Sequence, residues 1–317
     1  MGQAAGVAVD KQDHIWVIQR PATACQPSTE TEKKQSAKKE CKAAPPVMEF
    51  DQTGNLLRAW GGASEDYQWP GREHGITIDT KGFVWIGGNG PIDGQYLKFT
   101  PEGKFILQIG KSGTLTDSND VTRLGQPADA DIDIDANEVY IADGYHNHRV
   151  IVFDSESGAY KRHWGAYGNR PKDADLRQYN PTASQFANPV HCVRIAKDGL
   201  VYVCDRANNR IQVFQKNGTF IKEFIVEKGT RSSGSTWDLD FWIDPQQSLL
   251  FHADGSNSRV STLKRENGAA IARFGSSGSS PGEFHRLHNL AVDSAGNIYT
   301  TEVDTGNRAQ KFRLVQE

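Results

Sequence analysis

The fold is decided by the stretch FANPVHCVRIAKDGLVYVCDRANNRIQVF, residues 186–214. An alternating apolar run leads into a tight turn at Asp198-Gly199, and a second alternating run ends near Cys204. An Asn-x-Arg corner that ends at Arg210 separates this second run from a third. The pattern predicts three consecutive antiparallel strands, of which the first two form a hairpin.

This strand unit recurs six times along the chain, which is the sequence signature of a repeat architecture. The paired runs occupy residues 6–20, 75–88, 129–144, 192–206, 240–255 and 289–302. A fourth, outer strand is expected in the first five copies, at residues 56–62, 105–110, 160–168, 220–226 and 270–275. Four antiparallel strands repeated six times predict an all-β six-bladed β-propeller, formed by residues 1–317 as a single domain. The segment after Leu314 is too short for an outer strand, so the last blade is expected to be incomplete or cut short there.

Composition excludes several classes of partner. The chain has 317 residues, a formal net charge of −3 and 37% hydrophobic residues, which is enough for a packed core. It carries no basic stripe that would suit nucleic acid, and no apolar run approaches the roughly 20 residues that span a bilayer. The first residues lack the apolar stretch of a signal peptide. We expect a secreted or periplasmic protein whose natural leader has been removed, and a monomer, because a closed propeller needs no partner.

One long polar insertion interrupts the repeats. Residues 21–46 are rich in Lys and Glu and are flanked by Pro, which is typical of a solvated loop, and a disulfide between Cys25 and Cys41 would close it. Cys192 and Cys204 face each other in one predicted hairpin, where a disulfide and a pair of buried thiols fit equally well.

Histidine occupies one repeat position in alternate copies. The residue just before the first strand of each copy is, in chain order, Ala5, His74, Ala128, His191, Leu239 and His288. First strands line the channel of a propeller, and every second blade of six lies about 120° from the next, so three imidazoles should meet on the axis. Three imidazoles with an open position are typical of a catalytic zinc site, although imidazole also binds iron, cobalt, nickel and copper. The simpler interpretation is that each His lines a wet channel.

Three further side chains are expected at the same mouth. Arg20 and Arg206 follow second strands and would place two guanidiniums beside a metal cation, which suits a bound carboxylate. Tyr145 follows a similar corner and is a candidate general base or fourth metal ligand. The substrate expected from these groups is a small molecule or a peptide that ends in a carboxylate.

The Asn-x-Arg copies resemble NHL repeats, and more narrowly the chain resembles the peptidyl-α-hydroxyglycine α-amidating lyase family. The resemblance rests mainly on QPADADIDIDANEVYIADGYHNHRVIVF, residues 126–153, and on residues 186–214, and it is weaker at residues 72–79, 6–20 and 285–293.

That resemblance implies a zinc ion held by three His, and the matching positions are His74, His191 and His288. It also implies that Tyr145 acts as the base and that two Arg, here Arg20 and Arg206, orient the substrate. The implied reaction cleaves a C-terminal α-hydroxyglycine into a peptide amide and glyoxylate.

The sequence departs from the family pattern in places. The family has an Asp after its third His, which helps to bind a structural calcium together with backbone carbonyls that correspond to Val7 and Ile76. This chain has Asn289 there, a neutral oxygen donor, so calcium should bind weakly or not at all. A Met of the family is replaced by Arg286.

Three hypotheses of different classes follow from these residues. The first is a metal-dependent lyase that cleaves an α-hydroxyglycine-like carbinolamide. The second is a non-catalytic NHL propeller that binds a protein or a small ligand. The third is a metal-assisted lactonase or esterase, since one fold hosts many chemistries.

Overall fold

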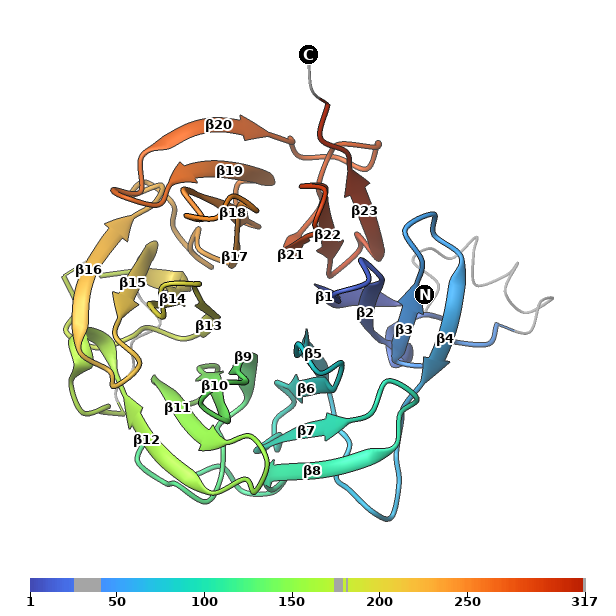
Figure 1. The fold of residues 1–317 in the computed structure, drawn as a ribbon, viewed down its shortest axis with the longest axis horizontal. Helices are drawn as coiled ribbons and strands as arrows, with labels where there is room; N and C mark the ends of the chain where they lie inside the picture. Colours follow the sequence, from blue (N-terminus) through green and yellow to red (C-terminus); the bar gives the residue numbers. More distant parts are fainter. Residues whose placement is uncertain (26–40, 174–178, 181, 316–317) are drawn as a thin grey trace.

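The computed structural model describes residues 1–25, 41–173, 179–180 and 182–315. Six antiparallel sheets stand around a central channel, and the chain passes through them in sequence order (Figure 1). Five sheets have four strands and the last sheet has three. The prediction of an all-β six-bladed propeller with an incomplete final blade is therefore confirmed.

Each blade starts with its innermost strand and ends at the rim (Figure 1). Blades one to three consist of β1 (Gln3–Val9), β2 (Ile15–Arg20), β3 (Val47–Phe50) and β4 (Leu56–Trp60); β5 (Glu73–Ile78), β6 (Val84–Gly88), β7 (Gln95–Phe99) and β8 (Phe105–Gly110); and β9 (Pro127–Asp133), β10 (Glu138–Asp143), β11 (Arg149–Asp154) and β12 (Tyr160–Trp164). Blades four to six consist of β13 (Val190–Ile195), β14 (Val201–Asp205), β15 (Arg210–Phe214) and β16 (Phe220–Ile225); β17 (Asp238–Phe241), β18 (Leu249–Asp254), β19 (Arg259–Lys264) and β20 (Ala270–Phe274); and β21 (Leu287–Val292), β22 (Ile298–Glu302) and β23 (Arg308–Phe312). Short 3-10 helices occur at η1 (Pro21–Thr23), η2 (Ala166–Gly168) and η3 (Arg206–Asn208).

Apolar side chains of neighbouring blades pack between the sheets. Between blades three and four, Tyr140 and Val152 belong to the same cluster as Val203 and Phe214, and all four are fully buried. Alternation along each strand sends successive side chains to opposite faces, and both faces of a blade are covered by its neighbours. The middle strand β14 is consequently buried along its whole length.

The turns between first and second strands use glycine where the backbone requires it. Gly82, Gly199 and Gly296 have φ values of 89°, 82° and 82°. Glycine adopts this left-handed region without a steric penalty, so these three turns, of which the sequence analysis named the one at Gly199, return the chain directly into the second strand.

Buried ion pairs fix the corners between second and third strands. Arg149 and Asp143 are both fully buried, with 2.8 Å between Nε and Oδ2. Arg210 and Asp205 make the equivalent contact in blade four at 2.6 Å. Arg149 also donates to three carbonyl oxygens, those of Ser118, Asp120 and Arg123. The Asn-x-Arg pattern is thus a structural clamp, and in blade three it holds the corner that carries Tyr145.

Both predicted cysteine pairs are disulfides. Cys25 is bonded to Cys41, at the two ends of the polar insertion predicted at residues 21–46, whose middle lies outside the described residues. Cys192 is bonded to Cys204, its direct partner in the register of β13 and β14. Two disulfides are typical of proteins that reside in an oxidising compartment.

The ring closes where β1 packs beside β21 and β22 of the last blade. Among the described residues, β23 has no further strand on its outer side. In that same part of the chain, none of the helices has the length and apolarity that crossing a bilayer demands.

Candidate metal centre

The three histidines lie on β-bulges of the innermost strands. The register between first and second strands shifts at His74 in β5, at His191 in β13 and at His288 in β21. A bulge adds one unpaired residue and re-aims its side chain, here toward the other two histidines. The sequence analysis put these residues just before the strands, whereas each is the second residue of its strand. The extra residue interrupts the alternation, which is why the apolar pattern starts after it.

The three imidazole rings form a compact triangle. The ring centroids lie 4.6 Å apart for His74 and His288, 4.9 Å for His191 and His288, and 5.0 Å for His74 and His191. One ring nitrogen of each lies within 4.8 Å of the others. All three side chains are buried. The structure therefore brings together the three residues that the repeat pattern singled out.

Backbone carbonyls fix the orientation of each ring. His74 Nδ1 lies 2.7 Å from the carbonyl oxygen of Ala128, and His288 Nδ1 lies 2.6 Å from that of Ala5. His191 Nδ1 makes the same contact with the carbonyl oxygen of Trp237. A carbonyl only accepts, so Nδ1 carries the proton in every ring and the Nε2 lone pair is left to bind a ligand.

Burial keeps the three rings neutral at physiological pH. Desolvation is the largest cause, and it lowers the pKa of His74 and of His191 well below the usual 6.5. The other two rings lower the pKa of His74 further, and the charge of Arg206 does the same for His191. Desolvation and the charge of Arg20 lower the pKa of His288 to about 3. Neutral imidazole is the form that binds metal, so no proton has to be removed first.

The contacts of Tyr145 test whether a metal fits the triangle. Its hydroxyl oxygen lies 2.9 Å from His74 Nε2 and 3.1 Å from His191 Nε2, and it accepts a hydrogen bond from Arg206 at 3.2 Å. A phenol has one proton, which cannot serve two lone pairs. Three neutral imidazoles with at least one unsatisfied lone pair and an adjacent oxygen are the donor set of a three-His zinc site with an open position. The residues fit such an ion.

Two guanidiniums lie beside the triangle, that of the buried Arg20 and that of the half-buried Arg206. Arg206 stacks over the Trp237 ring at 4.3 Å, and burial lowers its pKa. Arg20 donates to the carbonyl of Glu73 and to the side chain of Gln3, at 2.9 and 2.7 Å. Burial, reinforced by a neighbouring Arg, lowers the pKa of Arg20 to about 10, which still leaves it charged at neutral pH. An anionic ligand would compensate both charges.

The residues that the resemblance assigns to calcium have the following contacts. Asn289 Oδ1 lies 2.5 Å from His288 Nδ1 and shares the hydrogen bond of that N–H with the Ala5 carbonyl, and Asn289 Nδ2 donates to Asp238 at 2.9 Å. Val7 and Ile76 line a cavity farther along the channel. The Asn289 oxygen is thus engaged by a ring proton and is not a free donor for a cation.

Two more groups lie at this centre: Trp237, which the sequence analysis did not name, and Arg286, which it named only as a departure from the family pattern. Trp237 supplies the carbonyl for His191 and the ring under Arg206, and Arg286 also lies over that ring, at 5.5 Å, while paired to Asp304 at 2.9 Å. The sequence offers one signal for Trp237. It is an aromatic residue two positions before Leu239, and Leu239 is the residue of blade five that aligns with the three histidines.

One other cluster in the described residues has metal-ligand chemistry, namely Asp10, His14 and Glu49. Here His14 Nδ1 contacts Glu49 at 2.8 Å, Arg58 pairs with the other Glu49 oxygen at 2.5 Å, and Asp10 accepts from the Trp16 indole. These groups neutralise one another, so we assign them a structural role.

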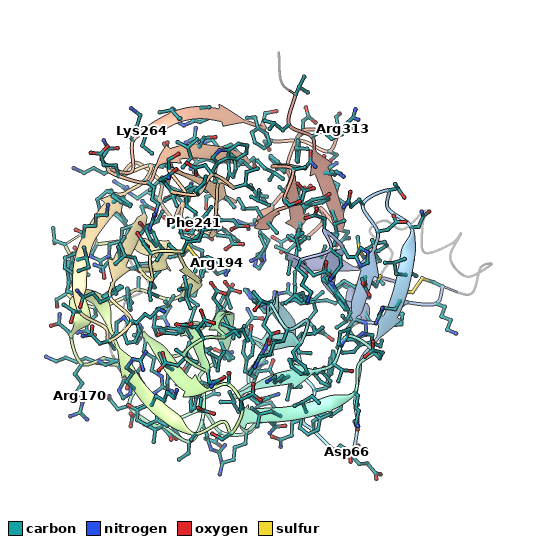
Figure 2. The ribbon with its side chains drawn as sticks, viewed as in Figure 1. Asp66, Arg170, Arg194, Phe241, Lys264 and Arg313 are labelled. Carbon is teal, nitrogen blue, oxygen red and sulfur yellow. A yellow bond between two sulfur atoms is a disulfide. The ribbon has the colours of Figure 1, made fainter. Side chains whose placement is uncertain are left out.

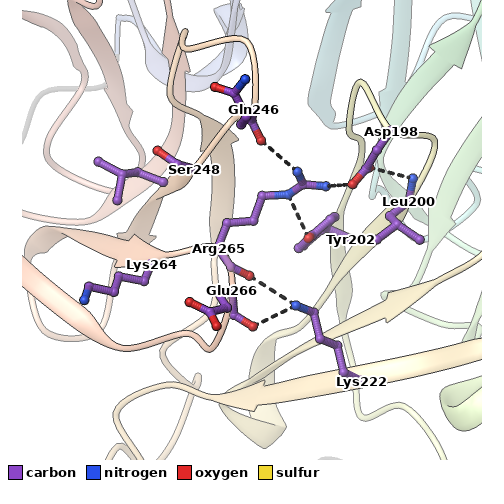
Figure 3. A pocket seen from close by; sticks show the side chains of 10 residues that line it. Asp198, Leu200, Tyr202, Lys222, Gln246, Ser248, Lys264, Arg265 and Glu266 are labelled. Carbon is purple, nitrogen blue, oxygen red and sulfur yellow. Dashed lines mark hydrogen bonds and ion pairs between the residues drawn. The ribbon is translucent and has the colours of Figure 1, made fainter.

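A pocket of about 520 Å³ lies between blades four and five, with Tyr202 and Arg265 in its lining (Figure 3). Several of its charged groups are engaged by neighbouring groups. Arg265 binds Asp198 at 2.6 Å and Tyr202 at 2.9 Å, and Lys222 donates to the Glu266 carbonyl at 2.8 Å. This pocket lies at the boundary between two blades, and its lining contains none of the residues of the histidine centre.

Comparison with known proteins agrees with the fold and the repeats. The NHL repeat profile matches residues 124–153 and 190–214. The chain is 30% identical over 253 residues to the peptidylglycine alpha-amidating monooxygenase of Rattus norvegicus, which covers 77% of this chain but only 24% of that protein. It is 26% identical to peptidyl-alpha-hydroxyglycine alpha-amidating lyase 2 of Drosophila melanogaster, covering 83% and 59%.

Two further similarities concern proteins with other names. NHL repeat-containing protein 3 of Mus musculus is 28% identical over 226 residues, which cover 69% of this chain and 56% of that protein. A solved streptogramin B lyase superposes with a TM-score of 0.55 at 12% identity, covering 100% of this chain and 84% of that one. At that identity, the superposition shows a shared fold alone. The matches span from about a quarter to just under 60% of the length of the sequence relatives named here.

Proposed function

We propose that this chain, an NHL-repeat propeller that resembles the peptidyl-α-hydroxyglycine α-amidating lyases, is a metal-dependent lyase. Its substrate is a C-terminal α-hydroxyglycine-like carbinolamide, and its products are an amide and glyoxylate. One observation carries this proposal: the Tyr145 hydroxyl lies within hydrogen-bonding distance of two neutral imidazoles and of the Arg206 guanidinium, and the third imidazole has a ring nitrogen within 4.8 Å of the other two.

The metal would be held by His74, His191 and His288, and zinc is the ion that best suits three imidazoles with an open position. When bound, it supplies Lewis acidity toward the substrate hydroxyl. The chain's own residues bind and orient the rest of the substrate. Arg20 and Arg206 hold the substrate carboxylate, because a guanidinium pairs with a carboxylate through two parallel hydrogen bonds.

Tyr145 is positioned to take the hydroxyl proton. Its oxygen is fixed by Arg206 on one side and by two imidazoles on the other, so it faces the place where the substrate hydroxyl would lie. As the O–H bond breaks, the carbonyl of glyoxylate forms and the C–N bond breaks. The electron pair of that bond goes to the amide nitrogen, which takes up a proton and leaves as the amide. Nothing is oxidised or reduced.

The experiment is glyoxylate release from α-hydroxyhippurate, measured together with metal content. Tyr145→Phe should keep the metal and lose about 10²- to 10⁴-fold in rate, the usual contribution of a positioned acid or base. His191→Ala should lose both metal and activity. The matched control is His146→Ala, because His146 is an exposed His next to Tyr145 whose ring lies 3.1 Å from the Thr116 carbonyl and is not part of the histidine triangle. The proposal fails if the wild-type protein holds metal and releases no glyoxylate.

The same assay separates the other hypotheses. Similarity to NHL repeat-containing protein 3 favours a binding propeller as the second candidate, and that function predicts neither bound metal nor turnover. Hydrolysis of lactones or esters without glyoxylate release would favour the third hypothesis, a metal-assisted lactonase or esterase. The two disulfides lead us to place the protein outside the cytosol, as a secreted or periplasmic protein, and the closed ring of blades favours a monomer.

A further inference from the structure

The channel next to the histidine triangle contains a buried arginine. Arg194 lies three residues beyond His191 on β13, on the inner side of the ring (Figure 2). Its side chain is 14% exposed, and it pairs with Asp129 of β9 and with Asp238 of β17, the latter at 3.0 Å. Both carboxylates are almost completely buried. One cation therefore joins blades three, four and five at the axis.

The two carboxylates are attached to the groups that orient the histidines. Asp129 directly follows Ala128, whose carbonyl accepts the Nδ1 proton of His74. Asp238 directly follows the residue whose carbonyl accepts from His191. Because adjacent backbone atoms move together, fixing these two carboxylates also fixes the two carbonyls and, through them, two of the three rings.

The third ring, that of His288, is connected to the Asp238 carboxylate through Asn289. Its Nδ2 donates to the Asp238 carboxylate at 2.9 Å, and its Oδ1 accepts from His288. The backbone amide of Leu290 donates to the same carboxylate at 3.1 Å. All three metal-binding rings are thus connected to the two carboxylates that Arg194 binds.

We propose that the Arg194 guanidinium is the resident cation of this channel and takes the structural place that the family resemblance gives to calcium. Arg194 lines a cavity of about 220 Å³ together with Val7 and Ile76, the residues whose carbonyls the resemblance assigns to that ion. A divalent cation there would stand beside a fixed positive charge and would find Asn289 in place of a carboxylate. The inference does not depend on the lyase reaction.

Two more carboxylates line that cavity, and backbone amides engage both. Asp131 accepts from the amides of Ile132 and Ile195, and Asp240 accepts from those of Phe241 and Val292. Among the described residues, the channel carboxylates are not grouped closely enough to form a metal cluster. Arg194 offsets one of these four negative charges, and the backbone amides stabilise Asp131 and Asp240 by hydrogen bonds.

The first test is calcium binding by the wild-type protein, using calcium chloride alone as the probe. Equilibrium dialysis with radioactive calcium should find no bound ion, and the melting temperature should be the same in calcium chloride as in magnesium chloride of equal concentration. One calcium bound per chain, with a raised melting temperature, would overturn the proposal.

The second test removes the internal cation. Arg194→Met keeps most of the side-chain volume and removes the guanidinium, and with Asn289→Asp it leaves three carboxylates facing the vacated site. This double variant should bind calcium and be stabilised by it, whereas Asn289→Asp alone should not, since Arg194 still occupies the place. A folded double variant without calcium binding, or calcium binding by Asn289→Asp alone, would equally contradict the inference. If the double variant does not fold, the wild-type and Asn289→Asp measurements still decide it.

The positioning role has its own readout. Arg194→Met should weaken zinc affinity about 10- to 100-fold in competition with a chromophoric chelator, the usual effect of removing a group that orients metal ligands. The control is Arg162→Met, which removes an Arg paired to Glu138 at 2.6 Å on an outer strand. That variant should leave zinc affinity and the calcium response unchanged. Equal zinc affinities in the two variants would contradict the positioning role.

Discussion

The corner arginines should differ greatly in their contribution to stability, although the sequence gives them the same motif. Arg149 is fully buried, pairs with the fully buried Asp143 and donates to three carbonyls besides. Arg259, the counterpart in blade five, is 25% exposed, lies 3.8 Å from Asp254 and pairs with Glu227 at 2.7 Å. The first is a closed network in the protein interior and the second is a partly solvated ion pair.

Substitution by Met tests this difference, because Met keeps most of the side-chain volume and removes the charge. Arg149→Met leaves a buried carboxylate without its cation, which should cost about 3–5 kcal/mol of unfolding free energy. Arg259→Met should cost about 1 kcal/mol or less, since solvent screens the lost pair. The assay is urea denaturation followed by tryptophan fluorescence.

A second substitution separates the pair from its surroundings. Asp143→Asn in the Arg149→Met background should recover part of the loss, because it removes the uncompensated charge. Equal losses for Arg149→Met and Arg259→Met would refute the reasoning. Such a result would mean that the buried network contributes no more than a surface ion pair.

Three further predictions concern pH, the substrate and the hairpin disulfide. Burial and nearby Arg259 lower the pKa of His252 to about 3, so only the unfolded chain takes up this proton between about pH 6.5 and 3. The free energy of unfolding of the wild type therefore falls as the pH falls. Relative to wild type, His252→Leu should gain about 1.4 kcal/mol of unfolding free energy for each pH unit below 6.5, measured in urea titrations. A difference between the two proteins that does not change with pH would contradict this. Arg206→Lys should lower kcat/KM for glyoxylate release about 10- to 100-fold, because Lys cannot both stack on the ring and bind a carboxylate through two bonds; an unchanged KM would argue against carboxylate binding there. Replacing Cys192 and Cys204 by Ala should cost about 3 kcal/mol in denaturation by the loop-entropy relation, and no loss would show that packing alone holds the hairpin.

The sequence predicted the architecture because the architecture is repetitive. Each blade needs the same alternation, the same tight turn and the same corner, so six weak signals reinforce one another. The alternation of histidine with small residues was visible for the same reason. Equivalent positions of a ring lie at equal height, so a pattern in the aligned copies is a pattern in space.

What the sequence did not predict depends on the backbone and on single residues. The bulges at His74, His191 and His288 interrupt alternation and look like strand ends. The acceptors for the three Nδ1 protons are carbonyls, which every residue carries, so no side-chain pattern reveals them. Arg194 occurs in one copy only, and an Arg in an alternating run gives no sign that it occupies the channel.

The central claim is that imidazoles from blades two, four and six hold one ion between them. Its most direct test is metal analysis of the wild-type protein and of single His→Ala variants at positions 74, 191 and 288, each purified without chelators and dialysed against zinc. The account predicts about one zinc per wild-type chain and a large loss in each of the three variants, since two imidazoles alone bind weakly. A wild-type chain that retains no zinc, or three variants that retain as much as wild type, would contradict it.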